Sequence, residues 1–307
     1  MRVAVVDLGT NSTRLLVAEV DDGRITAELD RRTSVTRLGE QVDASGRLAD
    51  AAVERVFAAL EGYREAIEGA GARVAVATSA VRDAANGEAF RAQLRERFGI
   101  DARTISGDEE ARLTFLGATS GRPADGETLV LDIGGGSTEY VTGVPGAAPD
   151  FHVSTRAGSV RQTERHLSTD PPSPDEVAEL AEAVRGIVAS EVPDFVRATT
   201  TRGIAVAGTA TSLAAIDQEL DPYDPERVHG YTLSLAAAER ILAMLAALAL
   251  AQRRETAGLH PDRAPTIVAG AVILVESMRA FGLDEMEVSE ADILHGAALQ
   301  AGERTGP

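Results

Sequence analysis

The fold is decided by the stretch Leu129-Val130-Leu131-Asp132-Ile133-Gly134-Gly135-Gly136-Ser137-Thr138-Glu139, in which an apolar run ends in an acid, three glycines and two hydroxyl residues. The same order of residue types occurs at the amino end, in residues 3–13. Two copies of one strand, acid and glycine turn predict two similar halves. Each half would present a phosphate-sized loop to a shared cleft.

The two copies match position by position, and after the turn both continue as a strand rather than as a helix. Residues 13–20 and 139–142 are the returning strands. The pattern therefore predicts β-hairpins, unlike the strand-to-helix turns of Walker A and dinucleotide-binding loops. Corresponding residues are Asp7 and Asp132, Gly9 and Gly134, Ser12 and Ser137, and Thr13 and Thr138.

The composition is that of a globular protein. With 307 residues, 44% of them hydrophobic, the chain can form one large or two ordinary domains. Cysteine is absent, which excludes disulfides and fits a reducing cytoplasm. Lysine is absent too, which excludes a Walker A lysine and Schiff-base chemistry. The amino end lacks a secretory signal and residues 241–251 are too few to span a bilayer, so we expect a cytoplasmic protein without a membrane segment.

The net charge of -18 argues against nucleic-acid binding, which rests on positive charge. A polyanionic substrate would have to be held by local arginines, backbone N–H groups and a divalent cation. The alternative interpretation of this charge is an ordinary acid-rich surface.

Apolar periodicity and capping residues predict the remaining elements. The best domain boundary is the Gly- and Pro-containing segment 118–127. A strand at 203–206 runs into a helix whose amino end can bind anions. The other expected elements are a helix at 52–67, a strand at 74–77, a loop at 78–83, helices at 86–98 and 159–167, a helix capped by Ser173, a buried helix at 241–251 and a closing helix from 291.

Two candidate side chains have equally good structural explanations. Ser106 to Glu109 forms a capping-box pattern, and acids in a first helical turn are stabilising by roughly 0.3–1 kcal/mol each. That acidic cluster therefore needs no catalytic role. Arg82 follows a strand, where ligands often bind, but a structural role is favoured for it when it is considered alone.

The paired loops suggest phosphate chemistry. Glycines let backbone N–H groups approach phosphate oxygens, hydroxyls add donors, and the carboxylates coordinate hydrated Mg²⁺ or orient water. A single D-x-G turn is more often only a turn. The pair, flanked by hairpins, favours a phosphate site.

Several blocks, spread in order along nearly the whole chain, resemble the exopolyphosphatase/guanosine pentaphosphate phosphohydrolase (Ppx/GppA) family. They lie at 7–12, 77–83, 105–113, 132–139, 158–161, 207–211 and 289–296. The resemblance implies an α/β fold of two ribonuclease-H-like domains of the actin/Hsp70/sugar-kinase superfamily flanking a cleft. We expect domains at 1–122 and 123–307, with the alternative that the closing helix packs on the first domain.

The resemblance also implies roles for individual residues. Glu110 would be the general base for the attacking water, and Asp132 and Glu139 would take part in catalysis. Mg²⁺ or Mn²⁺ would be held by Asp7, Asp132 and Glu139, or these residues would order the water. Arg82 would clamp a phosphoryl oxygen. The other implied substrate-binding residues are Gly9, Thr10, Asn11, Ser12, Gly134, Gly135, Gly136, Ser137, Thr138, Gly208 and Thr209.

The chain departs from the family pattern at a few places. Thr10 stands where many relatives carry Ser, and Ala264-Pro265-Thr266 replaces an Ala-Asp-containing segment. Longer members continue into a helical carboxyl-terminal region, so we expect a short, two-domain form.

Three functions remain open. The first is Mg²⁺-dependent removal of terminal phosphate from inorganic polyphosphate, and the second is hydrolysis of guanosine pentaphosphate (pppGpp), which presents the same anhydride. The third is a non-catalytic phosphate sensor or actin-like assembly protein, which the joint presence of Glu110, Asp7, Asp132 and Glu139 disfavours. The expected partners are polyphosphate or pppGpp, no nucleic acid, no membrane, and a second copy of the chain as a possible homodimer.

Overall fold

The structure, a computed structural model, describes residues 1–304 and contains two compact units. Unit 1 consists of Met1–Ser120 together with the chain from Asp292 onward, and unit 2 is Gly121–Ala291. The expected boundary after residue 122 lies two residues from this division. The closing helix groups with unit 1, as in the alternative that the sequence left open.

Unit 1 is built on a five-stranded sheet of order β3-β2-β1-β4-β5. Strands β1 and β2 form the predicted antiparallel hairpin, β3 extends it, and β4 and β5 run parallel to β1. The bounds are β1 Arg2–Leu8, β2 Ser12–Asp21, β3 Arg24–Val35, β4 Ala72–Ala77 and β5 Arg103–Thr104.

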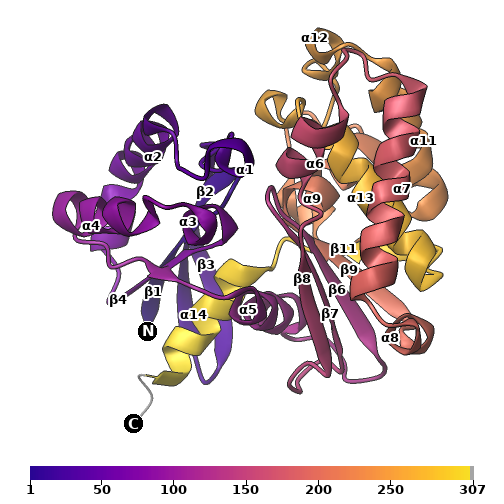
Figure 1. Ribbon diagram of the computed structural model, residues 1–307. Coiled ribbons are helices and arrows are strands. Elements are labelled where there is room, and N and C mark those ends of the chain that lie inside the picture. Colours follow the sequence, from indigo (N-terminus) through magenta and orange to yellow (C-terminus); the bar gives the residue numbers. More distant parts are fainter. Residues whose placement is uncertain (305–307) are drawn as a thin grey trace. The chain divides into compact units, whose positions relative to one another are not determined.

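Helices cover both faces of this sheet, because successive residues of a strand point to opposite faces. Ala4 and Val6 pack in one apolar core with helices α2 and α4, whereas Val3 and Val5 pack in another with α5 and α14. These helices are labelled in Figure 1. The helices of unit 1 are α1 Val42–Ser45, α2 Asp50–Glu68, α3 Ser79–Asp83, α4 Gly87–Phe98, α5 Gly107–Thr119 and α14 Ile293–Arg304.

Helices α5 and α14 touch through two glycines that leave no room for a side chain. A Cβ on Gly117 would lie 1.9 Å from the carbonyl oxygen of Asp292. A Cβ on Gly296 would lie 1.8 Å from the carbonyl oxygen of Leu113. The two backbones are therefore in direct contact at the start of α14.

Unit 2 repeats the arrangement in a six-stranded sheet of order β10-β11-β9-β6-β7-β8. Strands β6, β7 and β8 form consecutive antiparallel pairs, and β9 is parallel to β6, as β4 is to β1. The sheets thus confirm the predicted duplication and the ribonuclease-H-like fold class. The bounds are β6 Thr128–Ile133, β7 Thr138–Gly143, β8 Phe151–Thr155, β9 Arg202–Val206, β10 Tyr231–Ser234 and β11 Glu285–Val288.

One large apolar core joins this sheet to its helices. Leu129, Leu131 and Tyr140 pack with buried residues of α7, α9 and α13. These helices are labelled in Figure 1. The helical elements are α6 Ser159–His166, α7 Pro174–Glu191, α8 Asp194–Thr199, α9 Ala207–Asp217, α10 Pro225–Val228, α11 Leu235–Ala247, α12 Leu250–Arg253, the 3₁₀ turn Pro261–Arg263 and α13 Ile267–Phe281.

Most expected elements are confirmed, with two corrections. The segment 78–83 was expected as a loop, but Ser79–Asp83 forms α3, a helix too short to show apolar periodicity. The apolar run at 241–251 was expected as one helix, but α11 ends at Ala247 and α12 begins at Leu250. No helix within residues 1–304 combines the length and the apolar character needed to cross a bilayer.

Candidate phosphate-binding and hydrolytic site

The two glycine turns have the same local geometry. In unit 2 the Gly134 N–H donates to the Ser137 carbonyl at 3.0 Å, and in unit 1 the Gly9 N–H donates to the Ser12 carbonyl at 3.0 Å. A Cβ on either glycine would lie 3.0–3.1 Å from the carbonyl oxygen that closes its turn. The sequence repeat is therefore a structural repeat of two tight hairpin turns.

The carbonyl groups of Gly134, Gly135 and Gly136 in the unit 2 turn point at the amino end of α6. Gly134 accepts hydrogen bonds from the Ser159 N–H and Oγ, at 2.9 and 3.2 Å. Gly135 accepts from the Val160 and Arg161 N–H groups at 2.9 and 3.2 Å, and Gly136 accepts from Arg161 Nε at 2.7 Å. Three successive carbonyls of the turn are thus fixed against the first turn of α6.

This arrangement aims three N–H groups in the opposite direction. In a trans peptide the C=O and the following N–H point to opposite sides. The N–H groups of Gly135, Gly136 and Ser137 therefore point away from α6. Within residues 1–304, none of these three N–H groups donates a hydrogen bond. Adjacent backbone donors that point to one side form an anion-binding nest.

Gly158 allows α6 to approach the turn this closely. A Cβ on Gly158 would lie 2.2 Å from the Gly136 carbonyl carbon, 2.3 Å from the Gly135 oxygen and 2.4 Å from the Ser137 nitrogen. Any side chain at this position would displace the nest.

The carbonyl groups of the unit 1 turn are also fixed by hydrogen bonds, here from a neighbouring loop. The Thr10 and Asn11 carbonyls accept from the Gly39 and Arg37 N–H groups, both at 2.8 Å. The Asn11 N–H consequently points away from that segment. The Thr10 hydroxyl lies 2.8 Å from the Ser79 hydroxyl at the start of α3.

Asp132 and Glu139 face each other across the β6–β7 hairpin. Residues directly opposite in an antiparallel pair share a face, with Cβ atoms about 4.5–5.5 Å apart. Both side chains are buried, and Ser154 Oγ donates to Glu139 Oε1 at 2.7 Å. Two buried carboxylates thus lie side by side next to the nest.

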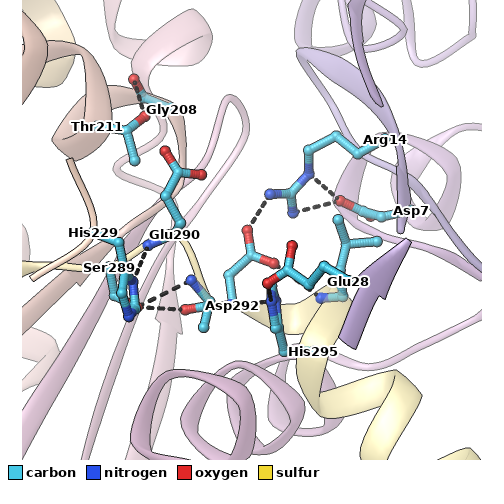
Figure 2. Close-up of polar contacts among 12 residues, drawn as sticks. Asp7, Arg14, Glu28, Gly208, Thr211, His229, Ser289, Glu290, Asp292 and His295 are labelled. Atoms are coloured by element: carbon cyan, nitrogen blue, oxygen red, sulfur yellow. Dashed lines mark hydrogen bonds and ion pairs between the residues drawn. The ribbon is translucent and has the colours of Figure 1, made fainter. Parts of the chain in front are cut away.

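The equivalent pair in unit 1 consists of an acid and an arginine instead of two acids. Asp7 pairs across β1–β2 with Arg14, which donates to Asp7 Oδ2 from Nε at 3.0 Å and from Nη2 at 2.7 Å. Figure 2 shows the same guanidinium donating through Nη1 to Asp292. The buried Asp7 Oδ1 has no hydrogen-bond partner among the described residues.

The two carboxylates that share Arg14 differ in their acidity. Burial raises the pKa of Asp7 above its usual range, against the attraction of Arg14. Burial acts in the same direction on Asp292, but the charges of Arg14 and Arg31, together with the hydrogen bond from the Leu294 N–H, hold the pKa of Asp292 below its usual range.

Glu110 and Arg82 are brought together in unit 1. Ser106 caps α5 through the Glu109 N–H, and Glu110 lies in the first turn of that helix. Arg82 Nη1 donates to the Ile105 carbonyl at 3.0 Å and to Glu110 Oε2 at 3.4 Å. Glu109 pairs with Arg103 instead. Burial and partner therefore distinguish Glu110 from Glu109, which the capping pattern could not separate.

The junction between β9 and α9 is a further feature of unit 2 next to the glycine turn. Strand β9 is parallel to β6 in a register that pairs Val206 with Asp132, so α9 begins beside that acid. Ala207 has a φ of 64°, in the left-handed region that costs energy for a residue other than glycine. Arg263 packs on Gly208 and donates to its carbonyl and, at 3.1 Å, to Ser212 Oγ.

The proposed metal ligands do not form one three-residue cluster within a unit. Among residues 1–304 no group of three or more His, Asp or Glu side chains could hold a metal ion. Asp132 and Glu139 form a two-carboxylate set in unit 2, whereas Asp7 belongs to unit 1 and is held by Arg14. A pair of carboxylates suits Mg²⁺, which usually keeps several waters and takes further ligands from substrate phosphates.

Sequence reasoning missed four residues that structure these sites, namely Arg14, Arg161, Arg263 and Asp292. Arg14 had a detectable signal, because extending the repeat by one residue aligns it with Glu139. Arg161 and Asp292 lie within blocks that resemble the family, but the resemblance gave them no role. Arg263 precedes the segment at which the chain departs from the family pattern.

The chain is similar to known proteins over nearly its whole length. The model of the Ppx/GppA phosphatase family matches residues 16–303. Exopolyphosphatase 2 of Mycobacterium tuberculosis is 38% identical, over 97% of this chain and 98% of the relative. The crystal structure of an exopolyphosphatase-like protein is 34% identical with a TM-score of 0.93, covering 99% of this chain and 98% of that one. The Aquifex aeolicus member of the family is 29% identical with a TM-score of 0.83, covering 100% and 99%. The chain belongs to the Ppx/GppA phosphatase family.

Proposed function

From this family membership, we propose that the chain is an exopolyphosphatase that hydrolyses the terminal phosphoanhydride of inorganic polyphosphate and releases orthophosphate. The single observation that carries the proposal is the nest of unit 2, in which Gly135, Gly136 and Ser137 direct three N–H groups away from α6. Those donors suit phosphoryl oxygens, and the acids Asp132 and Glu139 lie beside them.

Glu110 is proposed as the general base. It accepts a proton from the attacking water while the water oxygen bonds to the terminal phosphorus. The bond between that phosphorus and the bridging oxygen breaks, and the shortened chain leaves with the bridging oxygen. Arg82 orients the Glu110 carboxylate and, as predicted from the sequence, clamps a phosphoryl oxygen. Such catalysis works mainly through positioning and charge stabilisation.

The glycine turns and the start of α9 would bind the phosphates of the chain. Thr10, Ser12, Ser137, Thr138 and Thr209 supply hydroxyls at or next to the turns, and the backbone supplies the N–H donors. A helix amino end adds a favourable partial positive charge. The proposed donors carry little net positive charge, which is consistent with a chain whose net charge is -18.

A divalent cation is part of the proposal. Asp132 and Glu139 would hold Mg²⁺ or Mn²⁺, and Asp7 of unit 1 stays a predicted ligand or water-ordering residue. When bound, the cation would neutralise charge on the phosphoryl oxygens.

The test is phosphate release by the full chain from short polyphosphate, long polyphosphate and guanosine pentaphosphate, each with Mg²⁺, with Mn²⁺ and with a chelator. We expect metal-dependent release from polyphosphate. Release from guanosine pentaphosphate alone would assign the chain to the sister activity, which uses the same terminal anhydride. Binding of these ligands without any release would identify a sensor instead.

A further inference from the structure

The segment Ser289–Gly296 matches a family motif, yet the proposed chemistry gives it no role. We propose that Asp292, supported by His295, is a positioning residue that fixes Arg14 and, through Arg14, the orientation of the Asp7 carboxylate. The inference rests on the proposed function only in taking Asp7 as a site residue. All residues involved belong to unit 1.

Arg14 decides which oxygen of Asp7 remains available. Its Nε and Nη2 both donate to Oδ2, at 3.0 and 2.7 Å. Oδ1 is buried and has no hydrogen-bond partner among the described residues. A carboxylate held by two donors on one oxygen cannot rotate freely, so Oδ1 is the oxygen presented to a cation, water or substrate.

Asp292 occupies the remaining side of the guanidinium. Arg14 Nη1 donates to Asp292 Oδ2 (Figure 2), while Asp292 Oδ1 accepts from the Leu294 N–H at 3.0 Å. The two oxygens of Asp292 thus act separately, since one holds Arg14 and the other caps α14. With donors engaged on both acids, the guanidinium plane of Arg14 has one allowed orientation.

His295 holds the backbone of Asp292 in place. Its Nδ1 accepts from the Asp292 N–H at 3.3 Å, and its Nε2 lies 2.8 Å from Glu28 Oε1 (Figure 2). Because Nδ1 is an acceptor here, Nε2 carries the proton and donates to Glu28. His295 is only 5% exposed and joins the start of α14 to strand β3.

The contact between α14 and α5 links Asp292 to Glu110, the proposed base. Gly117 of α5 lies against the Asp292 carbonyl, and Gly296 of α14 lies against the Leu113 carbonyl, with no space for a side chain at either glycine. Helix α5 begins with the turn that contains Glu110. One helix contact therefore sets the positions of both Asp7, through Asp292 and Arg14, and Glu110.

The test compares the native chain with Asp292→Asn. Asparagine has nearly the same size and caps helices well, so the variant removes chiefly the charge that holds Arg14. We expect kcat for polyphosphate to fall about tenfold or more, since misplacement by 1 Å can cost about a hundredfold in rate. KM should change less than about threefold. The matched control is Glu276→Gln, a buried carboxylate of α13 that is also paired with arginine.

A second readout needs no activity. In the substrate-free protein, hydrogen exchange of the Arg14 Nε–H, followed by NMR, should accelerate about tenfold or more in Asp292→Asn and stay unchanged in Glu276→Gln. A purely structural role predicts equal losses of kcat in the two variants and an unchanged Arg14 signal, and that result would overturn the inference. If the native chain releases no phosphate, the proposed function fails, while the Arg14 signal still decides the inference.

Two substitutions, His295→Asn and His295→Gln, test the role of His295, because their side-chain amides lie at different distances from the backbone. Asparagine places an acceptor near the position of Nδ1, and glutamine places a donor near Nε2. If His295 acts through the Asp292 N–H, the loss of kcat in His295→Asn should be at least about threefold smaller than in His295→Gln. Equal losses, or the reverse order, would overturn the role of His295.

Discussion

Glu139 lies opposite Asp132 in the β6–β7 hairpin at the position where Arg14 lies opposite Asp7 in the β1–β2 hairpin. The duplicated position therefore carries opposite charges in the two units. In unit 1, Asp7 forms an ion pair with Arg14. In unit 2, Asp132 and Glu139 are two acids side by side. This difference makes unit 2 the better candidate to hold a divalent cation.

Glu139→Gln should raise the Mg²⁺ concentration needed for half-maximal phosphate release by about tenfold, because it removes one of the two adjacent carboxylates proposed as ligands. The measurement is a Mg²⁺ titration at saturating polyphosphate. The control is Glu287→Gln on β11, which removes a carboxylate that is paired with Arg122. An unchanged Mg²⁺ requirement in Glu139→Gln would remove Glu139 from the proposed metal site.

Glu110→Gln should lower kcat by about 10²–10⁴, the usual contribution of a general base, and leave thermal unfolding nearly unchanged. Its neighbour Glu109 pairs with Arg103 at the edge of the same helical turn, so Glu109→Gln should keep most of the activity. Steady-state rates of both variants separate the two acids. Full activity in Glu110→Gln would contradict the assignment of the base.

Arg82→Ala should lower kcat/KM by about tenfold or more, because Arg82 contacts Glu110 and is proposed to clamp phosphate. Thermal unfolding should shift by far less than activity. Arg103→Ala removes the guanidinium that pairs with Glu109 and serves as the control. An activity loss that merely follows a loss of stability would favour the structural interpretation of Arg82.

Gly158→Ala should raise KM strongly, because the added Cβ would collide with the backbone of Gly136 and displace the nest. Overpacking of this kind costs about 1–3 kcal/mol of unfolding free energy. Gly186→Ala, in a part of α7 where a Cβ meets nothing within 4 Å, should be neutral or stabilising by about 0.4–1 kcal/mol. Denaturant unfolding and KM measurements check both variants, and a fully active Gly158→Ala would contradict the described packing.

Asp7→Asn should abolish most activity yet unfold at an equal or higher temperature than the native chain at neutral pH. Burial raises the pKa of Asp7 in the folded state. Stability from its protonated form is fully present below the unfolded pKa of about 3.9 and is lost as pH rises through the folded pKa. The advantage of the variant should therefore shrink toward acidic pH. Thermal unfolding of the variant and the native chain between neutral and mildly acidic pH measures this, and an advantage of the variant that grows toward acidic pH contradicts it.

The hairpins, the glycine turns and the duplication could be predicted from the sequence because their signals are local. A buried strand, an acid and a glycine turn specify a hairpin within a dozen residues. The contact of Arg14 with Asp292 could not be predicted, because 278 residues separate them and only tertiary packing brings α14 to β2. The aim of the Gly135 to Ser137 N–H groups depends on α6, which supplies partners to the carbonyls behind them.

The pairing of Arg82 with Glu110 is a similar case. The sequence pointed to each residue by family resemblance, but nothing local relates the end of β4 to the start of α5. The short helix α3 replaces the expected loop and carries Arg82 to Glu110. Residues in short, irregular segments were thus placed less well than those in the hairpins.

The proposed nest at Gly135 to Ser137 would bind phosphate through peptide dipoles rather than through formal charge. Such contacts act at hydrogen-bond distance, whereas attraction between separated ions is screened over about 8 Å at physiological ionic strength. This part of substrate binding should accordingly resist added salt. Under the proposed function, a protein with a net charge of -18 would in this way hold part of a polyanion without an extended basic surface.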